Sequence, residues 1–256
     1  MNIVLMEYYR ELKGYTYEKL SELSGIPIET VQKIFKGEAF SLDCEALQAL
    51  EKVLKPEHYG NEVRETGAYG VKKKDYTLED YYALPEDQRV ELIDGKFYEM
   101  KAPTTGHQAA SMEISMQIFR YISRKKGQCR VLFAPVDVQL DCDDQTMVQP
   151  DVLIICDKDK IIRRCVMGAP DFIIEILSES TQKKDMYLKL HKYEAAGVRE
   201  YWMVDTDRRK VIVYFFEKDA YPAIYGMKDK IPVEIFGGEL EIDFALVEDT
   251  LTDIGQ

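Results

Sequence analysis

A carboxylate inside an apolar run, in the stretch GAPDFIIEILSES at residues 168–180, constrains the fold more than any other feature of the sequence. The run is bounded by Gly and Pro on one side and by Ser on the other, which predicts a short buried β-strand. Glu175 lies at its centre, between Ile174 and Ile176. An unpaired ion in a protein interior costs several kcal/mol, so the fold has to bring compensating charge to this strand.

Length and net charge limit the classes of protein that remain. A chain of 256 residues can hold one large domain, or a small domain and a medium one. The formal net charge of −12 argues against nucleic-acid or anionic-membrane binding driven by overall charge, because phosphate contacts need clustered Lys and Arg. Binding of that kind would have to use local basic patches.

Cysteine spacing and the lack of a long apolar run favour a cytoplasmic protein. The five cysteines are scattered, odd in number and without a CxxC pair, so the sequence indicates neither a disulfide framework nor a structural zinc site. The N-terminus lacks the basic region and cleavage site of a signal peptide, and no apolar run reaches the about 20 residues that span a membrane. We therefore expect a soluble protein of the reducing cytoplasm, with no membrane partner.

Residues 1–55 have the periodicity of helices alone and form the first predicted domain. Thr16 is a good N-cap for the segment YTYEKLSELSG, which ends at Gly25, and Pro27 opens a second segment, IPIETVQKIFKGE. Two short helices joined by a Gly-containing turn make a helix-turn-helix pattern. The segment resembles the Cro/lambda-repressor type of helix-turn-helix. The residues at the core positions of that family are Leu20, Gly25, Ile26, Val31 and Ile34.

By this resemblance the second helix would enter the major groove of DNA, with its outward side chains against bases or phosphates. The outward residues are Glu29, Thr30, Gln32, Lys33 and Lys36. Residues 1–55 hold seven Lys or Arg and nine Asp or Glu, so this unit is itself acidic. Self-association or protein docking, and a purely structural helical cap, remain as alternatives to DNA binding.

A linker and a larger domain are predicted after these helices. Residues 56–75 contain three glycines, a proline and many charges without an apolar period, which is typical of a linker. Residues 76–256 form the second domain, in which Asp94-Gly95 predicts a β-hairpin. Helices are predicted over 107–126 and within 181–198. Strands are predicted in the segments CRVLFAPVDVQLD, VQPDVLIICD, DFIIEILSES, REYWMVDTD and KVIVYFFEK.

The order of these elements and four signatures carry a second resemblance. The signatures are VELIDGKFYEM, VQPDVLIICD, GAPDFIIEILSEST and DMYLKLHKYEAAGVREYWMVD. Residues 76 to about 245 resemble the Uma-two family of restriction-endonuclease-like proteins, within the PD-(D/E)xK nuclease superfamily. The resemblance implies an α+β or α/β fold class: an N-terminal all-α helix-turn-helix domain, then a restriction-endonuclease-like core with a mixed central sheet flanked by helices.

The resemblance also implies a divalent cation and the residues around it. Phosphodiester cleavage needs a cation that generates hydroxide at neutral pH and neutralises charge in the transition state, and Mg²⁺ takes oxygen ligands. Asp151 and Glu175, on neighbouring strands, would bind Mg²⁺ or Mn²⁺, with the backbone carbonyl of Ile176 as a third ligand. The cation would compensate the buried charge of Glu175. Glu91, in the ELIDG signature, would help to hold the metal or its water, and His107 would border the cleft.

The sequence departs from the superfamily pattern at one position. The motif places a lysine two residues after the glutamate, where this chain has Leu177. Lys189 lies on the following predicted helix, on the same face as Asp185, and a long side chain there could reach back over the strand ends. We assign the lysine's role to Lys189, with Lys183 and Lys184 as rivals.

The leading hypothesis is therefore a metal-dependent DNA endonuclease that hydrolyses phosphodiester bonds and is tethered to DNA by its helix-turn-helix. Many nucleases of this class cut duplexes as dimers, so a second copy of the chain is a candidate partner. One alternative is a DNA-binding or regulatory protein whose nuclease fold is catalytically inactive. The presence of Leu177 where the motif has a lysine favours this alternative. Another is a protein-docking module on the same scaffold, which the acidic charge favours.

Overall fold

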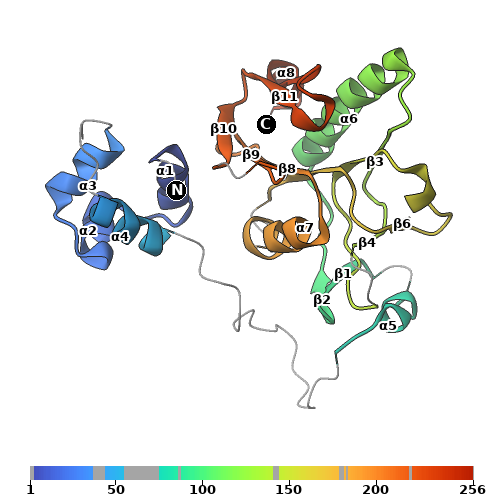
Figure 1. The fold of residues 1–256 in the computed structure, drawn as a ribbon, viewed down its shortest axis with the longest axis horizontal. Coiled ribbons are helices and arrows are strands. Elements are labelled where there is room, and N and C mark those ends of the chain that lie inside the picture. Colours follow the sequence, from blue (N-terminus) through green and yellow to red (C-terminus); the bar gives the residue numbers. More distant parts are fainter. Residues whose placement is uncertain are drawn as a thin grey trace. The chain divides into compact units, whose positions relative to one another are not determined.

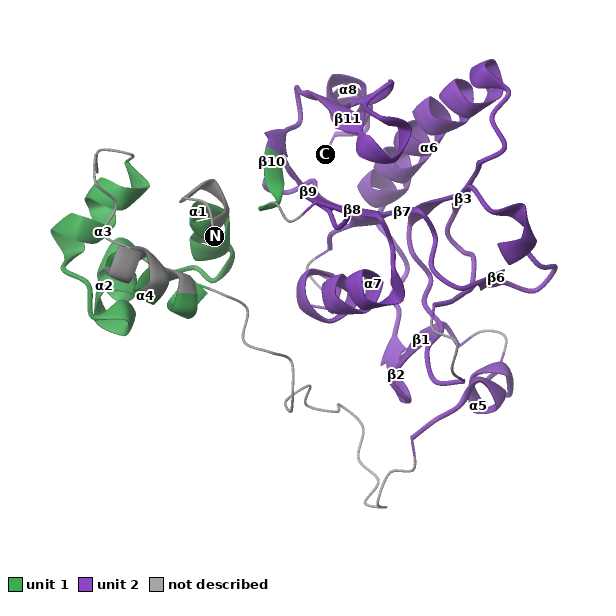
Figure 2. Ribbon diagram, in the orientation of Figure 1, with its two compact units in different colours: residues 1–63, 221–224 green, residues 64–220, 225–256 purple. Residues whose placement is uncertain are grey.

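The computed structural model describes residues 3–36, 44–54, 75–85, 88–140, 144–178, 182, 184–218 and 221–255 (Figure 1). It contains two compact units, residues 1–63 with 221–224 and residues 64–220 with 225–256 (Figure 2). The predicted linker at 56–75, apart from Asp75, and the rival lysine Lys183 lie outside the described residues. No helix in the described ranges is long and apolar enough to cross a membrane.

The described part of the N-terminal unit contains α1 (Ile3–Leu12), α2 (Tyr17–Ser24), α3 (Ile28–Phe35) and α4 (Cys44–Leu54). The predicted caps of α2 are present. The side chain of Thr16 accepts a hydrogen bond from the backbone N–H of Lys19 at 3.2 Å, and Gly25 ends the helix with a φ of 74°. Leu20 and Val31 are fully buried between the helices. The predicted helix-turn-helix pair is confirmed.

A six-stranded mixed sheet forms the centre of the fold after the N-terminal helices. Its strands, in spatial order, are β10 (Ala223–Gly226), β9 (Lys210–Phe215), β8 (Glu200–Asp205), β7 (Phe172–Ile176), β5 (Val152–Ile155) and β3 (Arg130–Phe133). β7 and β8 run parallel, whereas β5 is antiparallel to β3 and β7, and β9 is antiparallel to β8. The prediction of a mixed central sheet is confirmed.

Helices cover both faces of this sheet, as Figure 1 shows. One face carries α6 (Thr105–Lys125) and α8 (Phe244–Asp253), and the other carries the π-helical turn η2 (Lys184–Lys189) with α7 (Leu190–Ala196). Neighbouring residues of β8 point to opposite faces. The ring of Trp202 lies 5.1 Å from Phe172 and 6.1 Å from Phe244, while Tyr201 lies 5.0 Å from Tyr193 of α7. Both layers of the core therefore depend on this one strand.

The predicted hairpin is confirmed as β1 (Val90–Ile93) and β2 (Lys96–Glu99). Asp94 and Gly95 have φ values of 49° and 71°, as the two-residue turn of such a hairpin requires. The hairpin is not part of the main sheet. Instead, Leu92 exchanges backbone hydrogen bonds of 2.9 and 2.7 Å with Met147. This pairing fixes β1 beside the segment that leads into β5.

Smaller elements complete the described part of the region. They are α5 (Leu78–Tyr82), β4 (Val138–Gln139), η1 (Lys158–Lys160), β6 (Val166–Met167), β11 (Lys230–Val233), η3 (Glu234–Phe236) and β12 (Leu240–Asp243).

Two predictions of regular elements were wrong in detail. The segment CRVLFAPVDVQLD is not one strand but two, β3 and β4, separated by the cis Ala134–Pro135 peptide, since proline has no N–H to donate to a strand ladder. Among the described residues, the helix predicted within 181–198 is divided into the π-helical turn η2 at Lys184–Lys189 and the α-helix α7 at Leu190–Ala196. Periodicity alone does not distinguish these two helical geometries over one turn.

The expectation of no disulfide was also wrong. Cys129 and Cys156 form a disulfide across 27 positions of sequence. Arg130 pairs with Ile155 in the antiparallel ladder of β3 and β5, so the next residues outward, Cys129 and Cys156, lie opposite each other. The spacing of the cysteines along the chain does not indicate this strand register.

Glu200 is a fully buried carboxylate at the start of β8. Its Oε1 accepts a hydrogen bond of 2.7 Å from the indole N–H of Trp202, and its Oε2 accepts one of 3.0 Å from the backbone N–H of Ile235. Burial raises the pKa of Glu200 to about 7, although these hydrogen bonds lower it. The carboxyl therefore takes up a proton near neutral pH.

We expect the fluorescence of Trp202, the only tryptophan in the sequence, to titrate with a midpoint of about pH 7. The folded protein binds more protons than the unfolded chain between about pH 4.5 and pH 7, so this carboxyl makes the free energy of unfolding decrease as pH rises through that window. Glu200→Gln should remove the fluorescence titration, whereas Glu194→Gln on the surface should leave it. A midpoint that survives in Glu200→Gln contradicts the assignment.

Candidate active site

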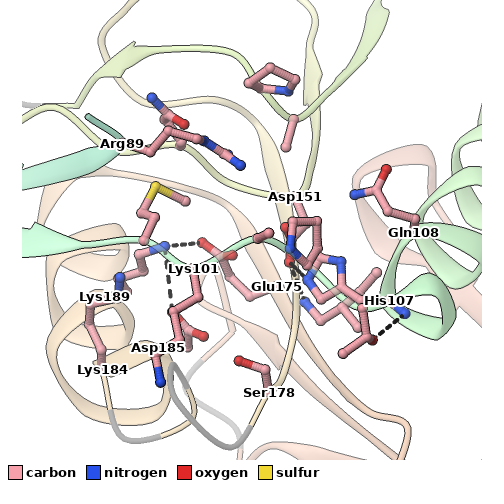
Figure 3. Close-up of a pocket in the computed structure, with 18 residues that line it drawn as sticks. Arg89, Lys101, His107, Gln108, Asp151, Glu175, Ser178, Lys184, Asp185 and Lys189 are labelled. Carbon is pink, nitrogen blue, oxygen red and sulfur yellow. Dashed lines mark hydrogen bonds and ion pairs between the residues drawn. The ribbon is translucent and has the colours of Figure 1, made fainter. Parts of the chain in front are cut away.

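A pocket of about 750 Å³ lies at the end of β7, between the start of α6 and η2 (Figure 3). Five of the residues predicted for the site line it: His107, Asp151, Glu175, Ile176 and Lys189. Glu91 lies behind this lining and is completely buried. The fold thus brings together residues from five separate segments of the chain.

The strand register places Asp151 and Glu175 side by side. Val152 pairs with Ile174 in the antiparallel ladder of β5 and β7, so continuing the register by one residue sets Asp151 opposite Glu175. Opposite residues of such a pair project to the same face, with Cβ atoms about 4.5–5.5 Å apart. The backbone N–H of Ile176 donates to Asp151 Oδ2 at 2.8 Å, which fixes this carboxylate at the strand end.

Glu175 is compensated by side chains of η2 and α7. Its Oε1 lies 2.8 Å from Lys189 Nζ and accepts a 2.6 Å hydrogen bond from the hydroxyl of Tyr193. Burial raises the pKa of Glu175 to about 8; Lys189 lowers it, while the charges of Asp185 and Asp151 raise it further. Within the protein, the partners of the buried Glu175 carboxylate are therefore Lys189 and Tyr193.

Glu91 shares the same lysine and has a second one. Its Oε1 lies 2.7 Å from Lys189 Nζ and accepts a 2.9 Å hydrogen bond from the backbone N–H of Gln149, and its Oε2 contacts Lys184 Nζ. Burial favours the neutral acid, but the two lysines outweigh it and lower the pKa of Glu91 to about 2. Glu91 is therefore held as an ionised carboxylate.

The turn η2 supplies both lysines. Lys189 is the more enclosed, with 3 % of its side chain exposed, and it also lies 3.4 Å from Asp185. Burial lowers the pKa of Lys189, but the charges of Glu175, Glu91 and Asp185 raise it well above its usual value. Lys184 has 13 % of its side chain exposed and lines the pocket. Single π-helical turns are frequent at functional sites.

His107 contacts the carboxylate of Asp151. Its Nε2 lies 3.1 Å from Asp151 Oδ2, and 14 % of its side chain is exposed. The residue belongs to the first turn of α6, where the side chain of Thr104 caps the helix by accepting from the N–H of His107. Burial lowers the pKa of His107, but the hydrogen bond and charge of Asp151 raise it above its usual value. His107 thus lines the pocket.

The donors around Asp151 and Glu175 fit a hard divalent cation. The side-chain contacts of Asp151 use Oδ2 and both hydrogen bonds of Glu175 use Oε1, so among the described residues the other oxygen of each has no hydrogen-bond partner. Mg²⁺ is usually bound through one or two carboxylates and several waters. Within the described ranges, no group of three His, Cys, Asp or Glu side chains could hold a metal. A site here would need water or backbone oxygens as well.

Several pocket residues were not identified from the sequence. Gln149 donates through its backbone to Glu91, and its side chain donates to Asp137 at 2.9 Å and to the Tyr81 hydroxyl at 3.1 Å. It precedes the Pro-Asp pair of the signature VQPDVLIICD, which was the available signal. Arg89 and Lys101 also line the pocket, on either side of the hairpin, and no motif singles them out.

The residues predicted to contact DNA lie on α3 or just after it. The side chains of Lys33 and Lys36 are exposed, and those of Thr30 and Gln32 are half-buried. In the part of the chain that the structure describes, none of these four side chains has a hydrogen-bond or ion-pair partner. They are available to a ligand of the helix-turn-helix.

Comparison with known proteins gives matches for both parts of the chain. Residues 78–245 match the family model "Uma2: Putative restriction endonuclease", and residues 6–55 match the model "HTH_3: Helix-turn-helix". An uncharacterized protein of Synechocystis, slr1290, is 24% identical over 170 residues, which are 64% of this chain and 88% of that protein.

A solved structure shares the fold of the larger part. It is the crystal structure titled as a putative nuclease belonging to DUF820 from Anabaena variabilis, with 24% sequence identity and a TM-score of 0.57. The match covers 68% of this chain and 98% of that one. With the family match over residues 78–245, these findings show that the chain belongs to the Uma2 family of restriction-endonuclease-like proteins and carries a helix-turn-helix before its nuclease fold.

Proposed function

We propose that this protein is a DNA endonuclease that depends on Mg²⁺ or Mn²⁺. The observation that carries the proposal is the placement of Asp151 opposite Glu175 in the register of β5 and β7, at the wall of one pocket. In the described part of the chain, one oxygen of each carboxylate has no hydrogen-bond partner. The family match supports the reaction class. We further propose that residues 1–55 and 76–256 act as two domains joined by a linker at 56–75, in the cytoplasm.

The proposed roles follow from the contacts of each residue. Asp151, Glu175 and the carbonyl of Ile176 would hold the cation. When bound, the cation would supply Lewis acidity to the phosphodiester and lower the pKa of the attacking water. His107, which already contacts Asp151, would orient that carboxylate. Glu91 would keep both lysines of η2 in place.

In the superfamily motif one lysine acts beside the carboxylates. Here Lys189 and Lys184 would share that role. Lys189 reaches the position beside Glu175 from η2, while Leu177 at the motif position is buried. With three carboxylates around it, Lys189 would mainly hold Glu175 and Glu91 in place. Lys184, which is more exposed and lines the pocket, would reach a phosphate oxygen of the substrate.

Nicking of supercoiled plasmid by the full chain with Mg²⁺ or Mn²⁺ tests the proposal. Asp151→Asn and Glu175→Gln should each reduce the rate of nicking by at least about 100-fold. Each removes a carboxylate that would hold the cation, and the cation would stabilise the charge of the transition state. The matched surface change Asp159→Asn should cut like the parent. If the parent fails to nick with either metal, the chain is instead an inactive nuclease fold that binds DNA, the alternative that Leu177 favours.

Lys189→Met and Lys184→Met separate the roles of the two lysines. Lys189→Met leaves buried carboxylates unpaired, so we expect it to lose about 3–5 kcal/mol of stability along with activity. Lys184→Met should reduce nicking while lowering the thermal midpoint much less. Thermal melting and nicking of the same preparations decide this. Equal melting temperatures for parent and Lys189→Met would show that Lys189 is not the structural cation of the site.

We propose that the helix-turn-helix tethers the enzyme to DNA through Thr30, Gln32, Lys33 and Lys36. Lys33→Ala combined with Lys36→Ala should weaken binding to duplex DNA and reduce the slope of log affinity against log salt by about 2, one for each lost phosphate contact. Lys52→Ala on α4 removes an exposed lysine of the same unit and should change neither. Gel-shift titrations at several salt concentrations measure both quantities. An unchanged slope in the double variant contradicts the tether.

A further inference from the structure

Helix α6 carries a line of exposed apolar side chains on its outer face. Met112, Met116 and Phe119 are 56%, 37% and 61% exposed and follow the i, i+4, i+7 spacing of one helical face. We call these three residues the α6 stripe. The opposite face of the helix is also apolar, with Ile114 and Ile118 completely buried against the core. The helix is therefore apolar on two sides, although only one of them is covered within the protomer.

The α6 stripe differs from the other exposed apolar residues of the described chain. Each of the others is separate: Leu23 lies on α2, Phe133 on β3, Met167 on β6 and Leu246 on α8, and Ile162, Tyr221 and Ile254 lie outside the helices and strands. Single exposed apolar residues are normal on protein surfaces, whereas contiguous ones mark interaction sites. Methionine and phenylalanine are also among the residues enriched at the centre of protein interfaces.

Charged residues beside the stripe indicate what covers it. Glu113 and Arg120 lie on one flank of the stripe, at nearly equal distances along the helix on either side of Met116. Arg120 is exposed and has no ion-pair partner among the described residues, and the carboxylate of Glu113 accepts only from Gln117. If a second α6 packs antiparallel across the stripe, Glu113 of each copy meets Arg120 of the other. The surface is complementary to itself.

We propose that the α6 stripe is the interface of a homodimer, in which the α6 helices of two copies pack antiparallel about a two-fold axis near Met116. Met112 of each copy then packs against the partner's Phe119, and the two Glu113–Arg120 pairs close one flank. Two-fold interfaces of this kind use the same patch on both subunits. The first turn of α6 holds His107, so the dimer sets two pockets roughly 28 Å apart along the helix direction, at 1.5 Å per residue.

Light scattering coupled to size exclusion tests the oligomeric state of the full chain. We expect the parent to have twice the mass of the 29.7 kDa chain, and Phe119→Asp to have the mass of one chain. The control Ile162→Asp places the same charge on another exposed apolar residue and should remain dimeric. A parent that is monomeric at high micromolar concentration overturns the proposal, and so does a Phe119→Asp variant that remains dimeric.

Charge reversal tests the orientation of the helices. Glu113→Arg and Arg120→Glu should each increase the dissociation constant of the dimer by about tenfold or more, because each sets like charges against each other at both ends of the interface. The double variant carries both reversals and should return to within about threefold of the parent. Far-UV circular dichroism confirms that each variant is folded. A double variant that is weaker than both single ones excludes the antiparallel pairing.

Discussion

The ammonium group of Lys189 is the interaction on which the rest of the site depends. It lies within 2.7–3.4 Å of carboxylates from β1, β7 and η2, which the sequence places far apart. Each of these carboxylates would be costly to bury alone. Together with Lys184 the cluster still has more carboxylates than lysines, and the pKa of Glu175 is raised first by burial and then by the charges of the neighbouring carboxylates. A surplus of negative charge beside Asp151 is what a divalent cation would neutralise.

Helix α6 connects the proposed chemistry with the proposed assembly. Its first turn carries His107 into the pocket, its buried face packs on the sheet, and its outer face carries Met112, Met116 and Phe119. A rigid helix of 21 residues transmits position along its length. Two copies joined through this helix would therefore present their pockets in a fixed relation, which suits a substrate with two strands.

Local sequence patterns predicted the elements well, and pairing across the fold poorly. Thr16, Gly25 and the Asp94-Gly95 turn act within a few residues, so their consequences could be predicted from the chain alone. The apolar run around Glu175 also predicted its burial. The disulfide of Cys129 and the contact of Gln149 with Glu91 depend on strand register and on where the hairpin docks. Neither is encoded in any single stretch of residues.

The π-helical turn η2 allows two lysines to contact the single carboxylate of Glu91. Lys184 and Lys189 are five positions apart and both reach Glu91. In an ordinary α-helix, residues five apart point about 140° away from each other, so one of the two would face solvent. The wider turn aligns them. If the same residues adopted the ordinary α-helical pitch, only one of the two amines would contact Glu91 and the other would point towards water.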